Sequence, residues 1–169
     1  MRLFIAIDIP PFEDFLIIQE KIKKITKCTI PKHFHITLKF LGNVEDNKLK
    51  DIIHRLNKIS FNEFEIKTEH LGFFPSIKKI NVVWLGIEKN QDLIKLNYQI
   101  NNLLHEFKDT HEFKPHITLA RTEHNPLLTD LLKIKLDSKK IKINSFKLYE
   151  SILTSQGPIY KVMKEFKSN

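Results

Sequence analysis

The sequence has one cysteine, few glycines and no long apolar run, and each shortage excludes a class of protein. Cys28 cannot form a disulfide within the chain, which excludes a disulfide-stapled secreted fold and favours a reducing compartment. The apolar start is interrupted by Asp8 and Pro10, so it is too short for a signal peptide, and no apolar stretch approaches the roughly 18 residues that a membrane span requires. The 4 glycines, with 41% hydrophobic and 28% charged residues, exclude collagen-like and disordered chains. We therefore expect a soluble cytoplasmic protein without a membrane partner.

Acidic residues are fewer than basic ones. The chain has 28 Lys and Arg residues against 20 Asp and Glu residues, which gives a formal net charge of +8. A basic surface favours a polyanionic partner, because neutralised phosphates release their counterions. A lysine-rich composition also produces an ordinary solvated surface. The charge alone therefore does not choose between a nucleic-acid partner and a plain basic surface.

The hydrophobic pattern predicts one order of strands and helices that occurs twice. Alternation predicts strands over residues 2–9, 35–41, 61–71, 81–87, 116–121, 141–153 and 159–166. Apolar residues at three- and four-residue steps predict helices over 11–25, 45–58, 91–107 and 125–132. Corresponding strands begin about 80 residues apart, a period too long and a copy number too low for a solenoid. We interpret this as a degenerate duplication, with pseudo-repeats of approximately 1–79 and 80–169.

The duplication predicts the fold class. Two copies of a strand–helix–strand–helix–strand unit are most economically arranged as two lobes that face one central cleft. We expect an α+β, bilobal, pseudo-two-fold fold with largely antiparallel sheets lining that cleft. No linker or shift in composition marks a separable part, so we expect a single two-lobed domain over 1–169, present as a monomer.

The tetrapeptide His-Ile-Thr-Leu occurs once in each pseudo-repeat, at residues 35–38 and 116–119. Residues two apart on a strand face the same side, so each histidine shares a face with its threonine, while Ile and Leu point into the core. The cleft would then contain four polar side chains: His35, Thr37, His116 and Thr118.

Two opposed imidazoles are suited to phosphoryl chemistry. The ordinary histidine pKa of about 6.5 allows one ring to be neutral and the other protonated near neutral pH. An in-line displacement at phosphorus needs a base on the side of the attacking oxygen and an acid on the side of the leaving oxygen. A threonine hydroxyl beside each ring can donate to the oxygens between them. This reasoning supports one acid and one base and leaves open which histidine is which.

A metal site is the main alternative for these histidines. His33 and His35 share a face, and His111 lies near His116 in the sequence. Against a metal, neither motif contains a carboxylate or thiolate, and threonine is a poor ligand. We therefore predict no metal and no cofactor. The remaining histidines have no partner pattern and are expected on the surface: His54, His70, His105 and His124.

With these motifs the sequence resembles the two-histidine phosphoesterases, in the branch of RNA 2′,3′-cyclic phosphodiesterases and 2′-5′ RNA ligases. The resemblance extends over nearly the whole chain, and its most specific part is the pair of motifs. Further matching segments are residues 2–7, 35–42, 72–75, 83–86, 115–121 and 150–160.

The resemblance implies metal-free hydrolysis of a 2′,3′-cyclic phosphate at an RNA 3′ end, tRNA fragments included, to a 2′-phosphomonoester. It implies that His35 donates a proton to the departing 3′ oxygen, and that His116 activates water. Thr37 and Thr118 would hold the phosphoryl oxygens. In related sequences an arginine three residues after the second threonine reaches the phosphate, and Arg121 matches it.

Further candidates for substrate binding lie outside the two motifs. Strict alternation places Arg121 on the face opposite His116, so its role requires a bulge or a long reach. Lys39 shares the face of His35 and Thr37 and is a second candidate for the phosphate. Three aromatic residues are candidates for stacking a terminal base: Phe73, Phe74 and Tyr160.

Three other functions remain open at the level of the sequence. The same site can run in reverse and join RNA ends in a 2′-5′ linkage. The chain can instead be a non-catalytic module that binds RNA ends, although arginine or lysine would serve simple phosphate binding better than histidine. The third alternative is a hydrolase for small nucleotides.

Overall fold

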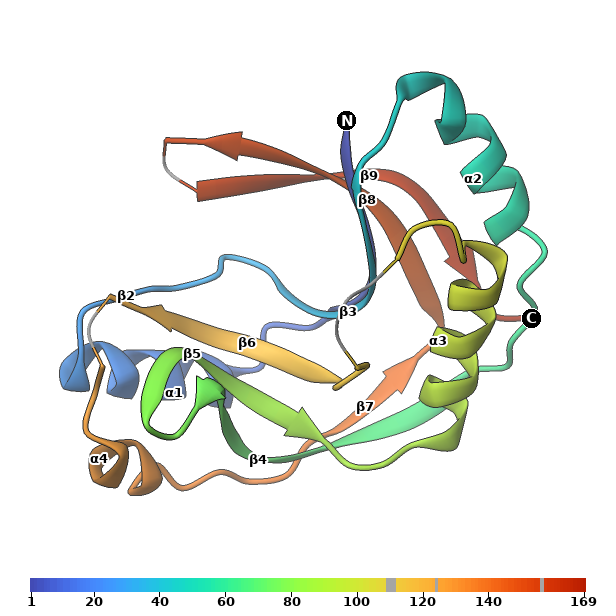
Figure 1. The fold of residues 1–169 in the computed structure, drawn as a ribbon. Coiled ribbons are helices and arrows are strands. Elements are labelled where there is room, and N and C mark those ends of the chain that lie inside the picture. Colours follow the sequence, from blue (N-terminus) through green and yellow to red (C-terminus); the bar gives the residue numbers. More distant parts are fainter. Residues whose placement is uncertain (109–111, 124, 156) are drawn as a thin grey trace.

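The computed structural model describes residues 1–108, 112–123, 125–155 and 157–169. These residues form two antiparallel β-sheets and four α-helices, so the predicted α+β fold is confirmed (Figure 1). None of the helices that the described residues form is long and apolar enough to span a membrane.

The first sheet has the order β3-β1-β8-β9 and the second the order β2-β6-β5-β4-β7. The strands of the first sheet are β1 (Arg2–Ile9), β3 (Phe34–Asn43), β8 (Ser145–Thr154) and β9 (Gly157–Lys167). Those of the second are β2 (Cys28–Thr29), β4 (Phe64–Ser76), β5 (Lys79–Ile87), β6 (His116–Thr122) and β7 (Lys140–Ile143). The predicted strand over 141–153 is thus two strands in different sheets, because the chain crosses from one sheet to the other at Asn144.

Each sheet contains strands from both pseudo-repeats. The third strand of the first repeat, β4, pairs with the first strand of the second repeat, β5. In the same way β8 of the second repeat pairs with β1 of the first. The two lobes are therefore not the two halves of the sequence, since the repeats exchange their last strands.

The helices also pack across the repeats. Helix α1 (Glu13–Ile25) packs against β6, whereas α3 (Gln91–Leu103) packs against β3. Helix α1 begins with acidic residues and ends with lysines, as the helix dipole favours. In α3 the Asn90 side chain accepts a hydrogen bond of 2.9 Å from the Leu93 backbone and caps the helix. Each motif strand is therefore covered by a helix from the other repeat.

The two remaining helices are shorter than the sequence pattern predicts. Helix α2 (Leu49–Leu56) follows a 3₁₀ turn over Asp46–Lys48, and α4 spans Leu128–Leu132. Figure 1 shows α2 beside α3 at one end of the molecule and α4 near α1 at the other, and these pairs are in contact. A large apolar core contains side chains from both sheets and all four helices. This shared core holds the two motif strands in place.

Candidate active site

Strands β3 and β6 carry the two His-Ile-Thr-Leu motifs and lie against one another, although they belong to different sheets. In both motifs the histidine and threonine are only partly buried. The intervening apolar residues are at most 2% exposed: Ile36, Leu38, Ile117 and Leu119. Both motifs therefore direct their polar side chains away from the core, as the alternation predicts.

The two histidine rings are held in the same way by the backbone. His35 Nδ1 lies 3.3 Å from the His33 carbonyl oxygen, and His116 Nδ1 lies 2.7 Å from the Lys114 carbonyl oxygen. Because a carbonyl only accepts hydrogen bonds, Nδ1 carries the hydrogen in each neutral ring. Nε2 is left with a free lone pair that can take a proton from a reactant.

Burial affects the charge of both rings. It lowers the pKa of His35 to about 4, and the nearby positive charges of His33 and His116 act in the same direction, while the His33 carbonyl and Asp8 oppose it. Burial is also the main cause of the lowered pKa of His116, and the cations of Arg121 and Lys114 add to it. Both rings are therefore neutral at pH 7 in the free protein, and an anion in the cleft would favour their protonated forms.

Aromatic side chains surround His35. The ring of His35 lies 5.6 Å from that of Phe4 and 5.4 Å from that of Tyr160, measured between centroids. Phe4 also stacks on Tyr149 at 5.1 Å. The ring of His33 is nearly parallel to that of His35, at 5.9 Å. These contacts account for the burial of the His35 ring.

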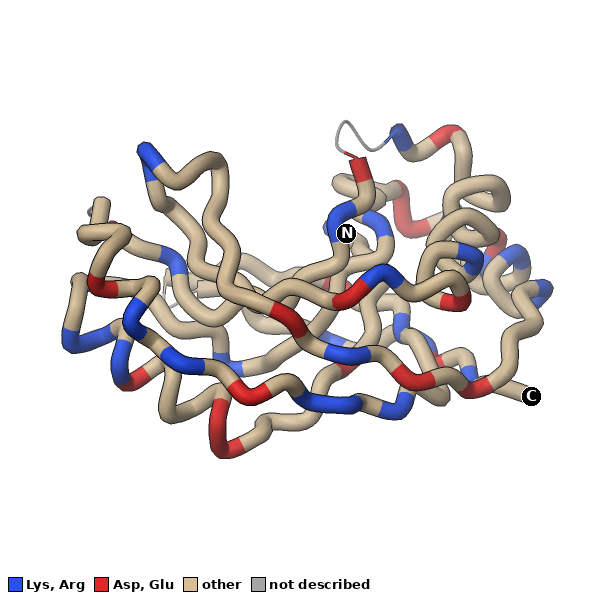
Figure 2. The backbone as a smooth tube through the Cα atoms, turned by 90° about the horizontal axis from the view of Figure 1, so that it is seen from below, with Lys and Arg blue, Asp and Glu red and all other residues tan. Residues whose placement is uncertain are grey.

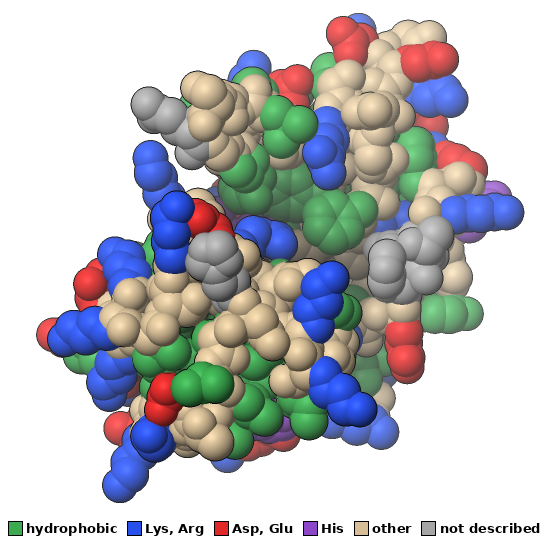
Figure 3. All heavy atoms as spheres, turned by 60° about the vertical axis from the view of Figure 1, so that its left-hand side comes forward, with side chains coloured by type: hydrophobic (Ala, Val, Ile, Leu, Met, Phe, Trp, Pro, Cys, Tyr) green, Lys and Arg blue, Asp and Glu red, His purple; other side chains and the backbone are tan. Residues whose placement is uncertain are grey.

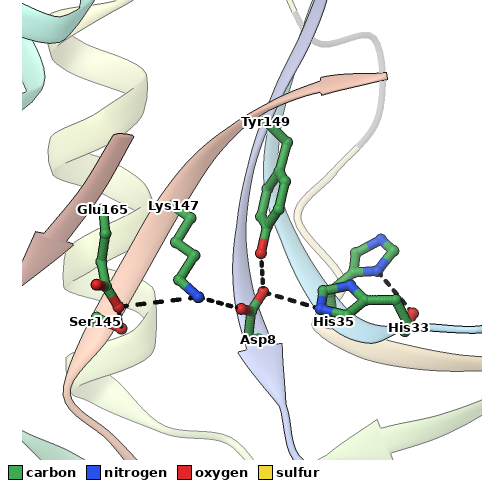
Figure 4. A network of polar contacts seen from close by, with 7 residues as sticks. All are labelled: Asp8, His33, His35, Ser145, Lys147, Tyr149 and Glu165. Carbon is green, nitrogen blue, oxygen red and sulfur yellow. Dashed lines mark hydrogen bonds and ion pairs between the residues drawn. The ribbon is translucent and has the colours of Figure 1, made fainter. Parts of the chain in front are cut away.

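The carboxylate of Asp8 is the centre of a polar network behind His35 (Figure 4). It accepts hydrogen bonds from the Tyr149 hydroxyl and from Lys147 Nζ, the latter at 2.5 Å. His33 Nε2 lies 3.5 Å from the same carboxylate. Asp8 is also the cross-strand partner of His35 in the pairing of β1 with β3. The network thus supports His33, whose carbonyl oxygen lies beside the His35 ring.

The surroundings of His116 are different. Its ring lies 5.0 Å from that of Phe74 and 5.7 Å from that of Trp84. Lys114 Nζ lies 4.7 Å from the Trp84 ring centroid, a cation–π distance. The indole lies over Gly72, where a Cβ atom would overlap it. A lysine and an indole therefore lie near His116, whereas a histidine and a carboxylate, His33 and Asp8, lie near His35.

Both motif strands shift register by one residue directly after the motif threonine. In β3 the pairs Ala6↔Thr37 and Ile5↔Lys39 leave Leu38 without an opposite residue. In β6 the pairs Trp84↔Thr118 and Val83↔Ala120 leave Leu119 without one. Such a bulge reverses the alternation that follows it.

The register shifts correct the expected facing of Lys39 and provide the bulge that a role for Arg121 requires. Lys39 does not share the face of His35: it is 3% exposed, and its Nζ donates a hydrogen bond of 2.6 Å to Asn101 Oδ1 on α3. Arg121, which strict alternation places opposite His116, is exposed, and its charge acts on the His116 ring. Phe40 occupies the equivalent position five residues after His35, with its ring 6.2 Å from that of Phe4.

The aromatic candidates separate into two groups. Tyr160 and Phe74 each contact one of the two histidine rings, whereas Phe73 packs against the core. Sequence reasoning missed Phe40 and Asp8. The signal for Phe40 was present, since an alignment of the two repeat sequences matches Phe40 with Arg121. No comparable signal pointed to Asp8. Asp8 lies across from His35, and the second repeat has Gly86 in the matching position across from His116.

The geometry also bears on the metal alternative. Within the described ranges no group of three His, Cys, Asp or Glu side chains is arranged to hold a metal ion. His33 contacts Asp8 rather than a second imidazole nitrogen. His111 and His124 lie outside the described residues.

Figure 3 shows a hollow in the surface of the molecule below the β8–β9 hairpin. Hydrophobic side chains line its upper wall, and Lys and Arg side chains stand around its edge. Along the backbone, basic residues are spread over the whole chain and alternate with acidic ones (Figure 2). The net positive charge is therefore not confined to the site.

Three comparisons relate the chain to known proteins. A model of the LigT-like phosphoesterases matches it twice, over residues 11–84 and 85–160. The RNA 2′,3′-cyclic phosphodiesterase of Archaeoglobus fulgidus is 35% identical over 98% of this chain and 99% of its own length. That of Methanocaldococcus jannaschii is 38% identical over 98% of this chain and 100% of its own.

Solved structures share the fold. A protein of Thermus thermophilus has a TM-score of 0.83 at 24% identity, and the match covers 99% of this chain and 97% of that one. E. coli LigT in its apo form has a TM-score of 0.74 at 24% identity, with 99% and 96% covered. E. coli LigT has also been crystallised with 3′-AMP.

Proposed function

Since the chain belongs to the LigT-like phosphoesterase family, we propose that it hydrolyses 2′,3′-cyclic phosphates at RNA 3′ ends to 2′-phosphomonoesters. The observation that carries this proposal is the pair of half-buried histidines on adjoining strands, each with Nδ1 at a backbone carbonyl and Nε2 left for chemistry.

In the proposed reaction His116 acts as the base. Its Nε2 takes a proton from water as the water oxygen attacks phosphorus, so the ring must be neutral at the start. Its lowered pKa and the neighbouring cations of Arg121 and Lys114 support that state. The charge of Arg121 would also attract the non-bridging phosphate oxygens.

In the same proposal His35 acts as the acid. As the bond from phosphorus to the 3′ oxygen breaks, the protonated ring gives its Nε2 proton to that oxygen, and the phosphate remains on the 2′ oxygen. With a pKa of about 4, the ring is protonated at neutral pH only when negative charge is close. The bound phosphate would supply this charge, in addition to Asp8, which already acts on the ring in the free protein.

The remaining motif residues would hold the phosphoryl group. Thr37 and Thr118 each stand two residues after a histidine on the same face of the strand, within reach of the oxygens between the two rings. Phe40, 55% exposed beside Phe4, offers a flat surface for the terminal base. No step in this mechanism requires a metal ion.

A product analysis tests the proposal. Short RNAs that end in a 2′,3′-cyclic phosphate are incubated with the protein in the presence of EDTA, and the monoester formed is identified. We expect a 2′-monoester, and we expect His35→Ala and His116→Ala each to lower kcat by about 10² to 10⁴. His54→Gln, a change at an exposed histidine, is the matched control.

Other outcomes would replace the proposal. A longer RNA product from paired halves would indicate ligation as the main activity. Binding without turnover, retained in the double variant of His35 and His116, would indicate an RNA-end-binding module. Loss of activity with EDTA and its return with a divalent ion would contradict the metal-free mechanism.

A further inference from the structure

Two buried amide side chains donate hydrogen bonds to the two bulge residues of the motifs. Gln19 Nε2 on α1 donates to the Leu119 carbonyl oxygen at 2.9 Å, and Asn97 Nδ2 on α3 donates to the Leu38 carbonyl oxygen at 2.7 Å. Gln19 is 3% exposed and Asn97 is 8% exposed. The two bonds are equivalent under the repeat, since each joins the first helix of one repeat to the motif strand of the other.

The carbonyls that these amides bind belong to the residues that have no opposite residue in the two strand pairings. Leu38 and Leu119 have no opposite residue in their ladders because the register shifts there. A buried carbonyl without a hydrogen-bond partner is unfavourable, so a regular ladder would otherwise compete with the bulge. Each amide removes that penalty and favours the shifted register.

The register shift decides which side chain follows the motif into the cleft. On the unshifted ladder Arg121 would face the core side and Ala120 the cleft, and the same exchange would place Lys39 rather than Phe40 beside His35. In the structure Leu119 and Ala120 are both fully buried and Arg121 is exposed. The hydrogen bond from Gln19 thus bears directly on the position of Arg121.

We propose that Gln19 and Asn97 are positioning residues of the active site, Gln19 for Arg121 and Asn97 for Phe40, through the bulge carbonyls of Leu119 and Leu38. The functional part of this inference rests on the proposed phosphodiesterase reaction. The structural part does not, because it concerns the register of β6 and β3.

Buried polar residues in these two helices are otherwise hard to explain. Gln19 occupies the apolar stripe of α1 between Phe15 and Ile22, where an aliphatic residue would add to the core. Asn97 occupies the matching stripe of α3 between Leu93 and Ile100. An amide there is unfavourable unless it is hydrogen-bonded. Polar residues at both equivalent positions are explained if each motif strand needs a hydrogen-bond donor for the carbonyl of its bulge residue.

The test uses Gln19→Met and Asn97→Leu, two substitutions that keep the size of the side chain and remove its donor. Backbone amide resonances are first compared with the wild type by NMR, without substrate. We expect Gln19→Met to shift resonances at residues 118–121 and to leave 37–40 unchanged, and Asn97→Leu to do the reverse. This readout does not depend on which reaction the enzyme catalyses.

The second part measures kinetics in combination with the residue each amide is proposed to position. We expect Gln19→Met to raise KM about tenfold or more for the cyclic phosphate, with a smaller change in kcat. In an Arg121→Ala background the same substitution should have almost no further effect on KM, because its target is gone. Asn97→Leu should keep its full effect there and lose it in a Phe40→Ala background.

The two parts fail in distinguishable ways. If the wild type does not hydrolyse the cyclic phosphate, the proposed function fails, and the NMR comparison still decides the register. The positioning role of Gln19 is refuted if the effects of Gln19→Met and Arg121→Ala on KM multiply in the double variant, as those of Gln19→Met and Phe40→Ala should. It is also refuted if Gln19→Met leaves the amide resonances of residues 118–121 unshifted. Should Gln19→Met not fold, Gln19→Asn, whose shorter amide cannot span the same distance, replaces it with the same expectation.

Discussion

The backbone is arranged in the same way around the two motif histidines, whereas the side chains around them differ. Around His35 and around His116 the backbone repeats the carbonyl at Nδ1, the register shift and the buried amide. The charges are not repeated. A carboxylate, Asp8, stands across from His35, whereas Gly86 stands across from His116 and the cations of Arg121 and Lys114 act on that ring.

This difference has a chemical consequence. Duplication preserves the backbone geometry around the two imidazoles, but identical surroundings would give both rings the same tendency to hold a proton. Negative charge near His35 favours its protonated form, and positive charge near His116 favours its neutral form. In the free protein burial outweighs Asp8 and lowers the pKa of His35 to about 4. The asymmetry therefore bears on the proposed roles, His35 as the acid and His116 as the base, only once a bound phosphate adds negative charge between the rings.

The largest expected effect separates the two roles by the leaving group. A nitrophenyl phosphodiester has a good leaving group that needs little protonation, so loss of an acid should matter less than loss of a base. We expect His35→Ala to lower kcat by about 10² or more on the cyclic phosphate and by much less on the nitrophenyl ester. His116→Ala should impair both substrates. Equal losses in both variants would contradict the assignment of acid and base.

The next effect concerns the indole that packs against His116. A Cβ at Gly72 would overlap the Trp84 ring, which cannot move far because it is 4% exposed. We expect Gly72→Ala to lower the free energy of unfolding by about 1 to 3 kcal/mol, as overpacking does, and to reduce kcat. Gly86→Ala is the control, since its Cβ would lie 3.4 Å from its nearest neighbours. Denaturant unfolding of both variants checks the difference.

Much of the fold could be predicted from the sequence because alternation and helical periodicity are strong in this chain. The strand over 2–9 and the helix start at residue 91 agree with β1 and α3. The exchange of β4 and β8 between the repeats could not be predicted, since strand pairing depends on contacts that no local pattern contains. The two-residue strand β2 is too short to produce a pattern at all.

The site was predictable where the two repeats agree and less so where they differ. The motif histidines and threonines could be found by their repetition. The facing of Lys39 was misread because a bulge has no signature in alternation. For the same reason the bulge that a role for Arg121 requires could not be located, although the buried polar residues Gln19 and Asn97 now offer such a signature. The monomeric state, the compartment and the action on tRNA fragments stay predictions.

A smaller effect tests the source of the asymmetry. Asp8→Asn keeps the shape of the side chain and removes the charge that opposes His33 and His116 at the His35 ring. We expect the pKa of His35 to fall below its present value of about 4, and kcat on the cyclic phosphate to fall about tenfold. The alkaline limb of the kcat profile should move to lower pH, because the acid loses its proton earlier.

The control for this variant is another carboxylate of the same network. Glu165 lies 3.9 Å from Lys147 Nζ, on the side of that lysine away from His33 and His35 (Figure 4). Glu165→Gln should leave the pH profile unchanged. An Asp8→Asn enzyme with the wild-type profile would show that the carboxylate only supports the fold. Tyr149, whose pKa is raised chiefly by burial and then by its bond to Asp8, stays neutral throughout this range.

The smallest expected effect is the coupling of anion binding to protons. Both rings have lowered pKa values in the free protein, and a bound anion raises them, so binding takes up protons. Affinity should therefore increase as the pH falls toward the free-state value of His35, about 4. Sulfate is a suitable probe because its own charge is constant in this range, and each proton taken up tightens Kd by at most about tenfold between pH 7 and pH 6. Calorimetry at both pH values measures this, and in His35→Ala the dependence should weaken because only the His116 ring remains to be protonated.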